Sequence, residues 1–456
     1  MSDPVAAADT GGIERRRAAE RPLLSETADT KTGRLSGRHR RSPEVRTTYR
    51  EVVAVPEFRA LWLGQGMSLL GDQLAQVALA VLVYSRTASP LATAAVYALT
   101  YLPPILGGPL LAGLADRYPR RRVMLWCDAL RALMLAAMAL PVTPFPVLCA
   151  LVFFVVLLGA PFSAARAALL PEVLEGDRYV VGSALQNVTN QAVQMLGFAA
   201  GGAAIAALGP YRALALDCAT FLGSALVIVA GVRHRPAPLR EDGERPSMWR
   251  MTLSGARLVF GERRLRTLVL FAWLCGFYVI PEGIAVPYAA ALADGKLPVP
   301  VITGLLMAAM PTGTVIGAFF FGRFVTPSGR LRGMGWLAML TCAPLVLCVI
   351  RPPLEGVLAL WVLSGVGGAY QLAANAAFVQ CVPASGRAAA FGLVQSGLLA
   401  AQGVGILVGG AAAQRLGPEA VVTLAGVAGL CAAAVLAMLW TESRKEIIAK
   451  VRAAAT

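Results

Sequence analysis

The sequence of 456 residues is poor in charge and in histidine. Charged residues make up only 15% of it and hydrophobic residues 57%, whereas about a quarter of a soluble domain is charged. A soluble chain of this length would form two or three domains, and too few charged side chains are present to cover their surfaces. This shortage excludes an ordinary soluble enzyme, and no enzymatic activity is predicted.

Metal-ligand and redox motifs are equally scarce. Only two histidines occur, His39 and His234, and both lie outside the apolar segments. The eight cysteines contain no CxxC pair. The sequence therefore predicts no metal site, no His-based catalytic centre and no disulfide framework. No GxxxxGK[ST] motif is present either, so we expect no nucleotide cofactor and no direct use of ATP.

The charges that are present are clustered, and long apolar stretches separate them. Each stretch is long enough to cross about 30 Å of hydrocarbon as a helix. The expected segments are 60–84, 91–115, 123–141, 147–168, 181–207, 212–231, 265–291, 301–322, 334–350, 357–380, 389–412 and 420–440. The sequence thus predicts an all-α polytopic membrane protein with twelve transmembrane helices.

Arginine is unevenly distributed over the loops. The loops after even-numbered segments and both chain ends are rich in arginine, whereas the loops after odd-numbered segments carry few basic residues. By the positive-inside rule both termini lie in the cytoplasm. The net charge of +15 follows from this asymmetry, so it does not indicate a nucleic-acid partner. We expect a monomer in the inner (plasma) membrane, with the lipid bilayer as its partner.

Composition divides the chain into five regions. Residues 1–55 form a basic arm without an apolar run and are expected to be disordered. Two six-helix bundles follow at 56–232 and 265–442, separated by a cytoplasmic linker, 233–264, which ends in an amphipathic helix. Residues 443–456 form a basic cytoplasmic tail.

The two bundles share a sequence repeat. Gly197, Gly201 and Gly202 of the fifth segment recur 208 positions later as glycines of the eleventh, each run being followed by Leu-Gly-Pro. Around the second loop of each half, Arg120 recurs 210 positions later as Arg330. A near-constant offset predicts two homologous halves in parallel orientation.

Two six-helix halves joined by a cytoplasmic linker resemble the major facilitator superfamily. The loop after the second segment is similar to its signature Gly-x-Leu-Ala-Asp-Arg-x-Gly-Arg-Arg, although Ala112 and Pro119 replace the two glycines. The resemblance implies a latch that stabilises the outward-facing state. The residues that occupy its positions are Asp116, Arg117, Arg120 and Arg121.

Within that superfamily, the first half is most similar to the macrolide-efflux and enterobactin-exporter branch. The similarity lies in Phe58–Gln65, Ser68–Asp72, Asp128–Ala132 and Pro161–Pro171. The fifth segment also resembles the antiporter signature Gly-Pro-x-x-Gly-Gly, with Phe198 in place of proline. Its glycines allow close helix packing that seals one side of a cavity.

Two acidic residues lie near the middle of apolar segments, Asp72 in the first and Glu282 in the seventh. Carboxyl groups are costly at membrane depth and mark functional sites. The repeat places these two at nearly equivalent depths, so we interpret them as proton-coupling residues. Pro281 and Gly283 also predict a locally broken helix around Glu282. A structural hydrogen bond from Asp72 to Gln76 is the alternative.

Other polar residues support weaker predictions. Asp128 and Arg131 share one helix face, and with Arg166 they form an expected charge network bracing the cytoplasmic gate. Asp217 is expected a turn or two inside the outer interface, where a structural role is favoured. The expected substrate-binding residues, for which interhelical hydrogen bonding is an equal alternative, are Gln76, Asn190, Gln194, Tyr278, Tyr370, Gln371 and Asn375.

These patterns predict a secondary transporter that exports an amphiphilic compound, such as a drug, siderophore or secondary metabolite, in exchange for protons. The alternative is uptake or uncoupled facilitated transport of a small metabolite. A lipid-modifying membrane enzyme is disfavoured because no interfacial cluster of His, Asp or Ser is present.

Overall fold

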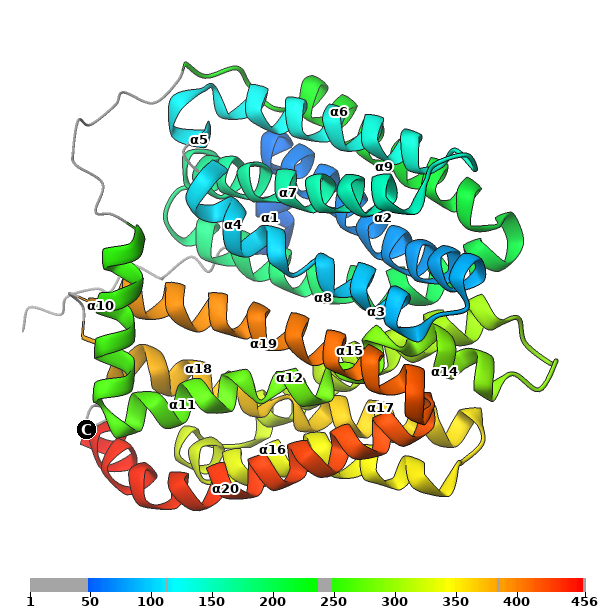
Figure 1. Cartoon of the computed structure of the whole chain (residues 1–456). Helices are drawn as coiled ribbons and strands as arrows, with labels where there is room; N and C mark the ends of the chain where they lie inside the picture. Colours follow the sequence, from blue (N-terminus) through cyan, green and yellow to red (C-terminus); the bar gives the residue numbers. More distant parts are fainter. Residues whose placement is uncertain (1–47, 112–113, 237–247, 384–385, 454–456) are drawn as a thin grey trace, which may run out of the picture. The chain divides into compact units, whose positions relative to one another are not determined.

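The computed structural model describes residues 48–111, 114–236, 248–383 and 386–453, which are built of helices and connecting loops (Figure 1). A short helix, α1 (Tyr49–Ala54), precedes the first bundle. The helices of that bundle are α2 (Pro56–Thr87), α3 (Pro90–Leu99), α4 (Leu102–Leu111), α5 (Leu114–Arg117), α6 (Arg120–Met138), α7 (Phe145–Val173), α8 (Asp177–Leu208) and α9 (Pro210–Gly231).

The second bundle follows the linker helix α10 (Met248–Gly261). Its helices are α11 (Arg263–Trp273), α12 (Cys275–Tyr278), α13 (Ile280–Gly283), α14 (Ala285–Leu292), α15 (Val299–Phe324), α16 (Pro327–Val346), the 3-10 helix η1 (Leu347–Ile350), α17 (Leu354–Gly367), α18 (Tyr370–Cys381), α19 (Arg387–Leu416) and α20 (Pro418–Ala453).

Eleven helical segments in the described ranges are long and apolar enough to cross a membrane. The expected third span, α6, does not reach that hydropathy because Arg121, Arg122, Asp128 and Arg131 lie on it. It nevertheless packs between α7 and α9, with Asp128 and Arg131 buried. The charges of α6 are thus directed into the first bundle, where other helices can provide partners.

Several of the spans are broken near their middle. The expected break around Glu282 is confirmed: the seventh span is divided into α11, α12, α13 and α14, with Ile284 outside helical geometry at φ −114° and ψ 19°. The second span is divided between α3 and α4 at Thr100 and Tyr101. The tenth is divided at Gly368 and Ala369. Breaks expose backbone groups, which is tolerated only where protein or a cavity surrounds them.

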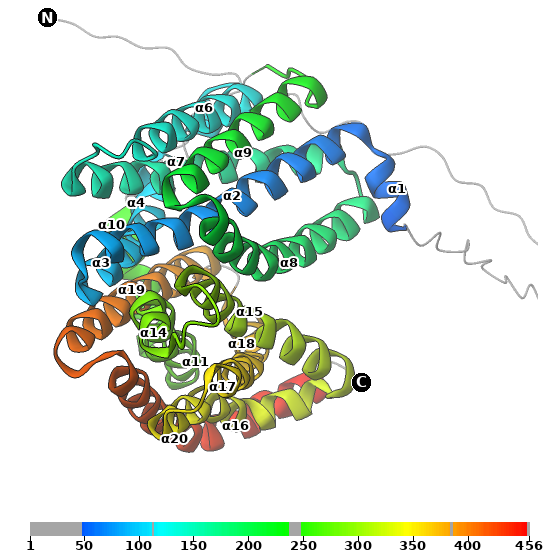
Figure 2. The ribbon, with the colours of Figure 1, turned by 90° about the vertical axis from the view of Figure 1, so that its right-hand side faces the viewer.

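The two bundles meet along two helix pairs, α8 with α15 and α3 with α19 (Figure 2). At the first, a Cβ atom on Gly202 would lie 2.4 Å from the carbonyl oxygen of Pro300 and 2.9 Å from the Cα of Gly304. At the second, a Cβ on Gly410 would lie 2.2 Å from the Cβ of Ala94. The close packing expected of the glycine-rich fifth segment is therefore present.

The repeat in the sequence corresponds to a repeat in packing. Gly202 and Gly410, which are 208 positions apart, both contact the opposite bundle. The preceding repeat pair, Gly201 and Gly409, does not contact the opposite bundle. Instead both glycines pack within their own bundle, Gly201 on Leu74 and Gly409 on Ile280. Equivalent glycines thus serve equivalent interfaces, as expected for two homologous halves.

The contacts between α8 and α15 and between α3 and α19 include the ends of these helices next to the loops that carry few basic residues. There Ser89 donates a hydrogen bond of 2.8 Å to Gln414 across the two bundles. In the predicted orientation these loops lie on the outer side of the membrane. In that orientation the conformation described is closed on the outer side.

The structure changes two expectations about the ends of the regions. Within the arm expected to be disordered, Tyr49–Ala54 form α1, whose Val52 is buried against Phe58 and Leu174; residues 1–47 lie outside the described residues. The last helix, α20, does not end near residue 440 but continues to Ala453. The division into bundles at 56–232 and 265–442 remains a prediction.

The amphipathic linker helix is present as α10, which runs across the ends of α11, α18 and α19 in Figure 1. It is not only an interfacial helix. Val259 is fully buried, and a Cβ on Gly255 would lie 2.5 Å from the carbonyl oxygen of Ala389. This helix is therefore packed on the second bundle.

Candidate functional site

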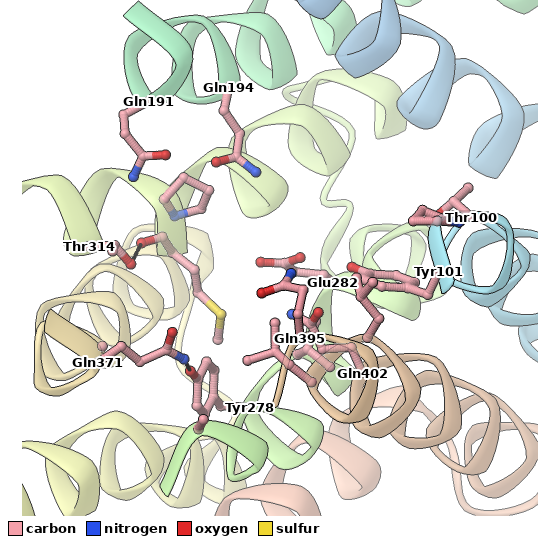
Figure 3. Close-up of a pocket in the computed structure, with 18 of the residues that line it drawn as sticks. Thr100, Tyr101, Gln191, Gln194, Tyr278, Glu282, Thr314, Gln371, Gln395 and Gln402 are labelled. Atoms are coloured by element: carbon pink, nitrogen blue, oxygen red, sulfur yellow. Dashed lines mark hydrogen bonds between the residues drawn. The ribbon is translucent and has the colours of Figure 1, made fainter. Parts of the chain in front are cut away.

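A cavity of about 1120 Å³ lies between the two bundles. Helices from both halves line it, including the broken spans around Tyr101 and Glu282 (Figure 3). Its lining is rich in amide and hydroxyl side chains, with few charged groups. The polar residues are Asp72, Gln73, Gln76, Tyr97, Thr100, Tyr101, Arg131, Ser163, Gln191, Gln194, Tyr278, Glu282, Thr314, Thr341, Ser364, Gln371, Asn375, Gln395 and Gln402.

Asp72 contributes a carboxylate from the first bundle. It accepts a hydrogen bond from Arg131 of α6 at 2.7 Å, and the side chains are 29% and 5% exposed, respectively. The arginine is thus buried in the bundle wall while the carboxylate is partly open to the cavity. This ion pair takes the place of the hydrogen bond to Gln76 that was the alternative for Asp72, because a guanidinium is the stronger partner for a carboxylate.

Glu282 contributes a carboxylate from the second bundle. Tyr97 of α3 donates a hydrogen bond to it at 3.3 Å, and the Tyr97 ring lies 6.0 Å from that of Tyr101. Figure 3 shows Glu282 and Tyr101 directed into the same part of the cavity. Among the described residues no lysine or arginine pairs with Glu282, so this carboxyl group is available to a ligand.

Five of the seven expected substrate-binding residues line the cavity: Gln76, Gln194, Tyr278, Gln371 and Asn375. Gln371 donates a hydrogen bond to the hydroxyl group of Tyr278. Both therefore present polar atoms from neighbouring helices of the second bundle, as Figure 3 shows.

The placement of the other two was wrong. Tyr370 is fully buried and donates a hydrogen bond of 2.8 Å to the carbonyl oxygen of Phe271, because the break after Gly367 turns it into the bundle. Asn190 accepts a hydrogen bond of 2.9 Å from Gln65 and is absent from the lining. For these two the interhelical alternative is the better description.

Several cavity residues had not been selected from the sequence. Tyr97 of α3 donates a hydrogen bond to Glu282, and Tyr101, four residues later at the break after α3, lines the same cavity. On α19, Gln395 and Gln402 lie seven residues apart and so share one helix face. That spacing was the available signal, but amides on an otherwise apolar helix are equally typical of helix–helix hydrogen bonds.

The expected charge network among Asp128, Arg131 and Arg166 is not formed among the described residues. Asp128 instead accepts a hydrogen bond of 2.7 Å from Ser224. Arg131 is bonded to Asp72, and Arg166 donates to Gln186 at 3.0 Å and also to Gln65. A spacing of three residues on a helix permits two side chains to pair but does not require it. Here residues on neighbouring helices are the closer partners.

The latch residues contact their own bundle. Arg120 pairs with Glu172 and donates to the carbonyl oxygen of Ala168 at 3.1 Å, while Arg121 donates to the carbonyl oxygen of Val229 at 2.6 Å. The guanidinium of Arg117 lies 5.7 Å from the centre of the Tyr118 ring. The side chain of Asp116 lies outside the described part of the chain. Among the side chains that the structure describes, no latch contact joins the two bundles, so the role of these residues remains a prediction.

Glu172 also belongs to an ion-pair cluster that joins α2 and α7 to the start of the linker. Arg235, at the start of the linker, pairs with Glu57 of α2 and approaches Glu172 of α7 at 3.5 Å. The hydrogen bonds that Arg235 donates to Glu57, followed by the charges of both carboxylates, raise the pKa of the Arg235 guanidinium. The cluster fixes the beginning of the linker to the first bundle.

Comparison with known families agrees with this architecture. The sequence model described as Major Facilitator Superfamily matches residues 61–296 and 298–455. Solved structures with the same fold include a POT family transporter in complex with 5-aminolevulinic acid, which is 13% identical with a TM-score of 0.67 over 86% of this chain and 96% of that one. A nucleoside transporter is 15% identical with a TM-score of 0.65, over 85% and 99%.

Curated relatives match over shorter stretches. A lysophospholipid transporter of Enterobacter sp. (strain 638) is 27% identical over 255 residues, which are 51% of this chain and 59% of that protein. A protein named as a bacilysin exporter of Bacillus subtilis is 29% identical over 197 residues, or 42% and 48%. The matches thus span about half the length of these relatives.

Proposed function

Because the chain belongs to the Major Facilitator Superfamily, we propose that it is a secondary active transporter which exports an amphiphilic compound in exchange for protons by alternating access. Drug-like compounds, siderophores and secondary metabolites are the expected substrate classes. The proton gradient across the inner membrane supplies the energy, so no bound cofactor is required.

One observation carries this proposal. Two carboxyl groups from opposite bundles, Asp72 and Glu282, line the same cavity. Such groups are expensive at membrane depth, and a role in binding and releasing protons accounts for their presence there. Since the cavity lies between bundles that are closed on the outer side, a change in bundle packing would alternate its access.

The lining supports an amphiphilic substrate. Amide and tyrosine side chains offer hydrogen bonds in several directions, and apolar residues such as Leu268, Val279 and Phe378 lie between them. Pockets of this kind bind ligands through apolar surface and orient them through a few polar contacts. The names of the relatives, an exporter and a lysophospholipid transporter, are in keeping with such cargo.

The test is transport in proteoliposomes with an imposed pH gradient. Wild type is compared with Asp72→Asn and Glu282→Gln, using a panel of drugs, siderophores and lysophospholipids and a pH-sensitive dye inside the vesicles. Substrate movement in wild type should be accompanied by proton movement in the opposite direction. In each amide variant the rate of proton-coupled substrate transport should be at least tenfold lower. Asp294→Asn, which removes an exposed loop carboxylate, is the matched control and should transport normally.

Substrate movement without proton movement, unchanged in both amide variants, would instead favour uncoupled facilitated transport. Inward accumulation driven by the same gradient would favour uptake. Folding of each variant is checked by size-exclusion chromatography, so that a lost rate is not confused with a lost protein.

A further inference from the structure

A buried polar cluster lies behind Asp72, between α2, α6 and α9 of the first bundle. Its acidic members besides Asp72 are Asp128 and Asp217, which are 0% and 1% exposed. Neither of these two lines the cavity. The cation of the cluster is Arg131, which is 4% exposed. The described residues therefore place three carboxyl groups and one guanidinium in the interior of one bundle.

Asp217 is inserted directly against α2. A Cβ atom on Gly71 would lie 1.9 Å from Oδ1 of Asp217 and 2.2 Å from Oγ1 of Thr220. Only a glycine at this position leaves room for the carboxyl group, and the next residue of α2 is Asp72. The α2–α9 interface is thus shaped to hold Asp217 beside the cavity carboxylate.

The charges of the cluster do not balance if every acid is ionised. Arg131 is engaged by Asp72 at 2.7 Å and by Ser68 at 3.3 Å, and its guanidinium lies 4.1 Å from the centre of the Phe221 ring. A single cation compensates one carboxylate, and an uncompensated charge in a protein interior is costly. If all three acids were ionised, two of the three charges would be uncompensated, so the cluster must hold protons on its acids.

Hydrogen bonding distinguishes Asp217 from Asp128. Oδ1 of Asp128 and Oδ2 of Asp217 are both without a partner among the described residues, so the difference lies in the hydroxyl group at the other oxygen. Ser224 donates to Oδ2 of Asp128 at 2.7 Å. Oγ1 of Thr220 lies 2.8 Å from the carbonyl oxygen of Asp217 and 3.0 Å from its Oδ1. A hydroxyl group has only one proton. If that proton goes to the carbonyl oxygen, the second contact is a hydrogen bond only when Asp217 itself donates.

We propose that Asp217 is a proton-binding site of this protein, occupied in the outward-closed conformation and separate from the cavity carboxylates. The titratable groups around it are Asp72 on α2, Cys127, Asp128 and Arg131 on α6, and Cys218 on α9.

The use of this proton in transport rests on the proposed function. The carboxylic acid of Asp217 gives its proton to the carboxylate of Asp72, so that one acid and one carboxylate are present before and after the transfer. Arg131 then compensates whichever carboxylate is ionised. The cluster keeps its total charge while the proton reaches the group that is open to the cavity.

Infrared spectroscopy of the purified full-length protein tests the site without any substrate. A buried protonated carboxyl group has a C=O stretching band that ionised carboxylates lack. We expect this band at neutral pH in wild type, the loss of one component of it in Asp217→Asn, and the displacement of that component in Asp217→Glu. The matched controls Asp128→Asn and Asp294→Asn should retain it.

An unchanged band in a folded Asp217→Asn protein would overturn the proposal, and so would the absence of the band in wild type. If Asp217→Asn does not fold, the displaced band in Asp217→Glu decides the question. Because no transport is measured, a result in favour of the site stands even if proton exchange with substrate is not observed. Where exchange is observed, Asp217→Asn should move at least one proton fewer per transport cycle than wild type.

Discussion

The packing of Gly202 against the second bundle predicts how one added methyl group changes the conformational equilibrium. In Gly202→Ala the new Cβ would lie 2.4 Å from a carbonyl oxygen of α15 and 2.9 Å from the Cα of Gly304. Both atoms belong to backbone, so neither can rotate away, and α8 and α15 must separate. The contact exists only when the outer side is closed, and the variant should therefore disfavour that state.

The size of the effect follows from overpacking, which costs about 1–3 kcal/mol when backbone has to shift. Since about 1.4 kcal/mol corresponds to a factor of ten, the ratio of outward-closed to outward-open protein should fall by roughly 5- to 150-fold. The matched control is Gly66→Ala, because a Cβ at Gly66 has no heavy atom within 4 Å.

Double electron–electron resonance between spin labels at Leu208 and Leu297 would detect the change. Both positions are exposed; Leu208 is the last residue of α8, and Leu297 lies just before the start of α15. Gly202→Ala should shift the distance distribution to larger values, while Gly66→Ala should match wild type. An unchanged distribution in Gly202→Ala, or an equal shift in both variants, would refute the reasoning.

Two further substitutions test the ion pair and a helix end. Arg131→Gln should destabilise the protein more than Asp72→Asn, by about 3 kcal/mol against about 1.5 kcal/mol, because it removes the cation of the cluster whereas Asp128 and Asp217 remain beside the arginine in Asp72→Asn; the double variant should recover part of the loss, and equal melting temperatures in detergent would contradict this. Arg330 donates to carbonyl oxygens at the end of α15, including that of Val325 at 2.8 Å, so Arg330→Gln should cost about 1–2 kcal/mol. Arg332→Gln, at an exposed position, should leave the melting temperature unchanged.

The sequence alone predicted the fold class, the repeat and the broken helix around Glu282. These depend on properties that are local or periodic along the chain: the length of an apolar run, the side on which arginines collect, and the inability of Pro281 to donate a backbone hydrogen bond. It also selected both acids that line the cavity, because a carboxyl group in an apolar segment is exceptional in any fold.

Only the tertiary structure decided which polar residues face the cavity and which partners they have. Asn190 and Gln194 are one turn apart on α8, yet only Gln194 lines the cavity. Arg131 of α6 pairs with Asp72 on α2 and not with Asp128 on α6. A sequence gives the spacing of side chains along a helix, but the direction of each helix face and the partners that it meets are set when the helices pack. For that reason Asp217, for which the sequence favours a structural role near the outer interface, stands beside Asp72 in the folded bundle.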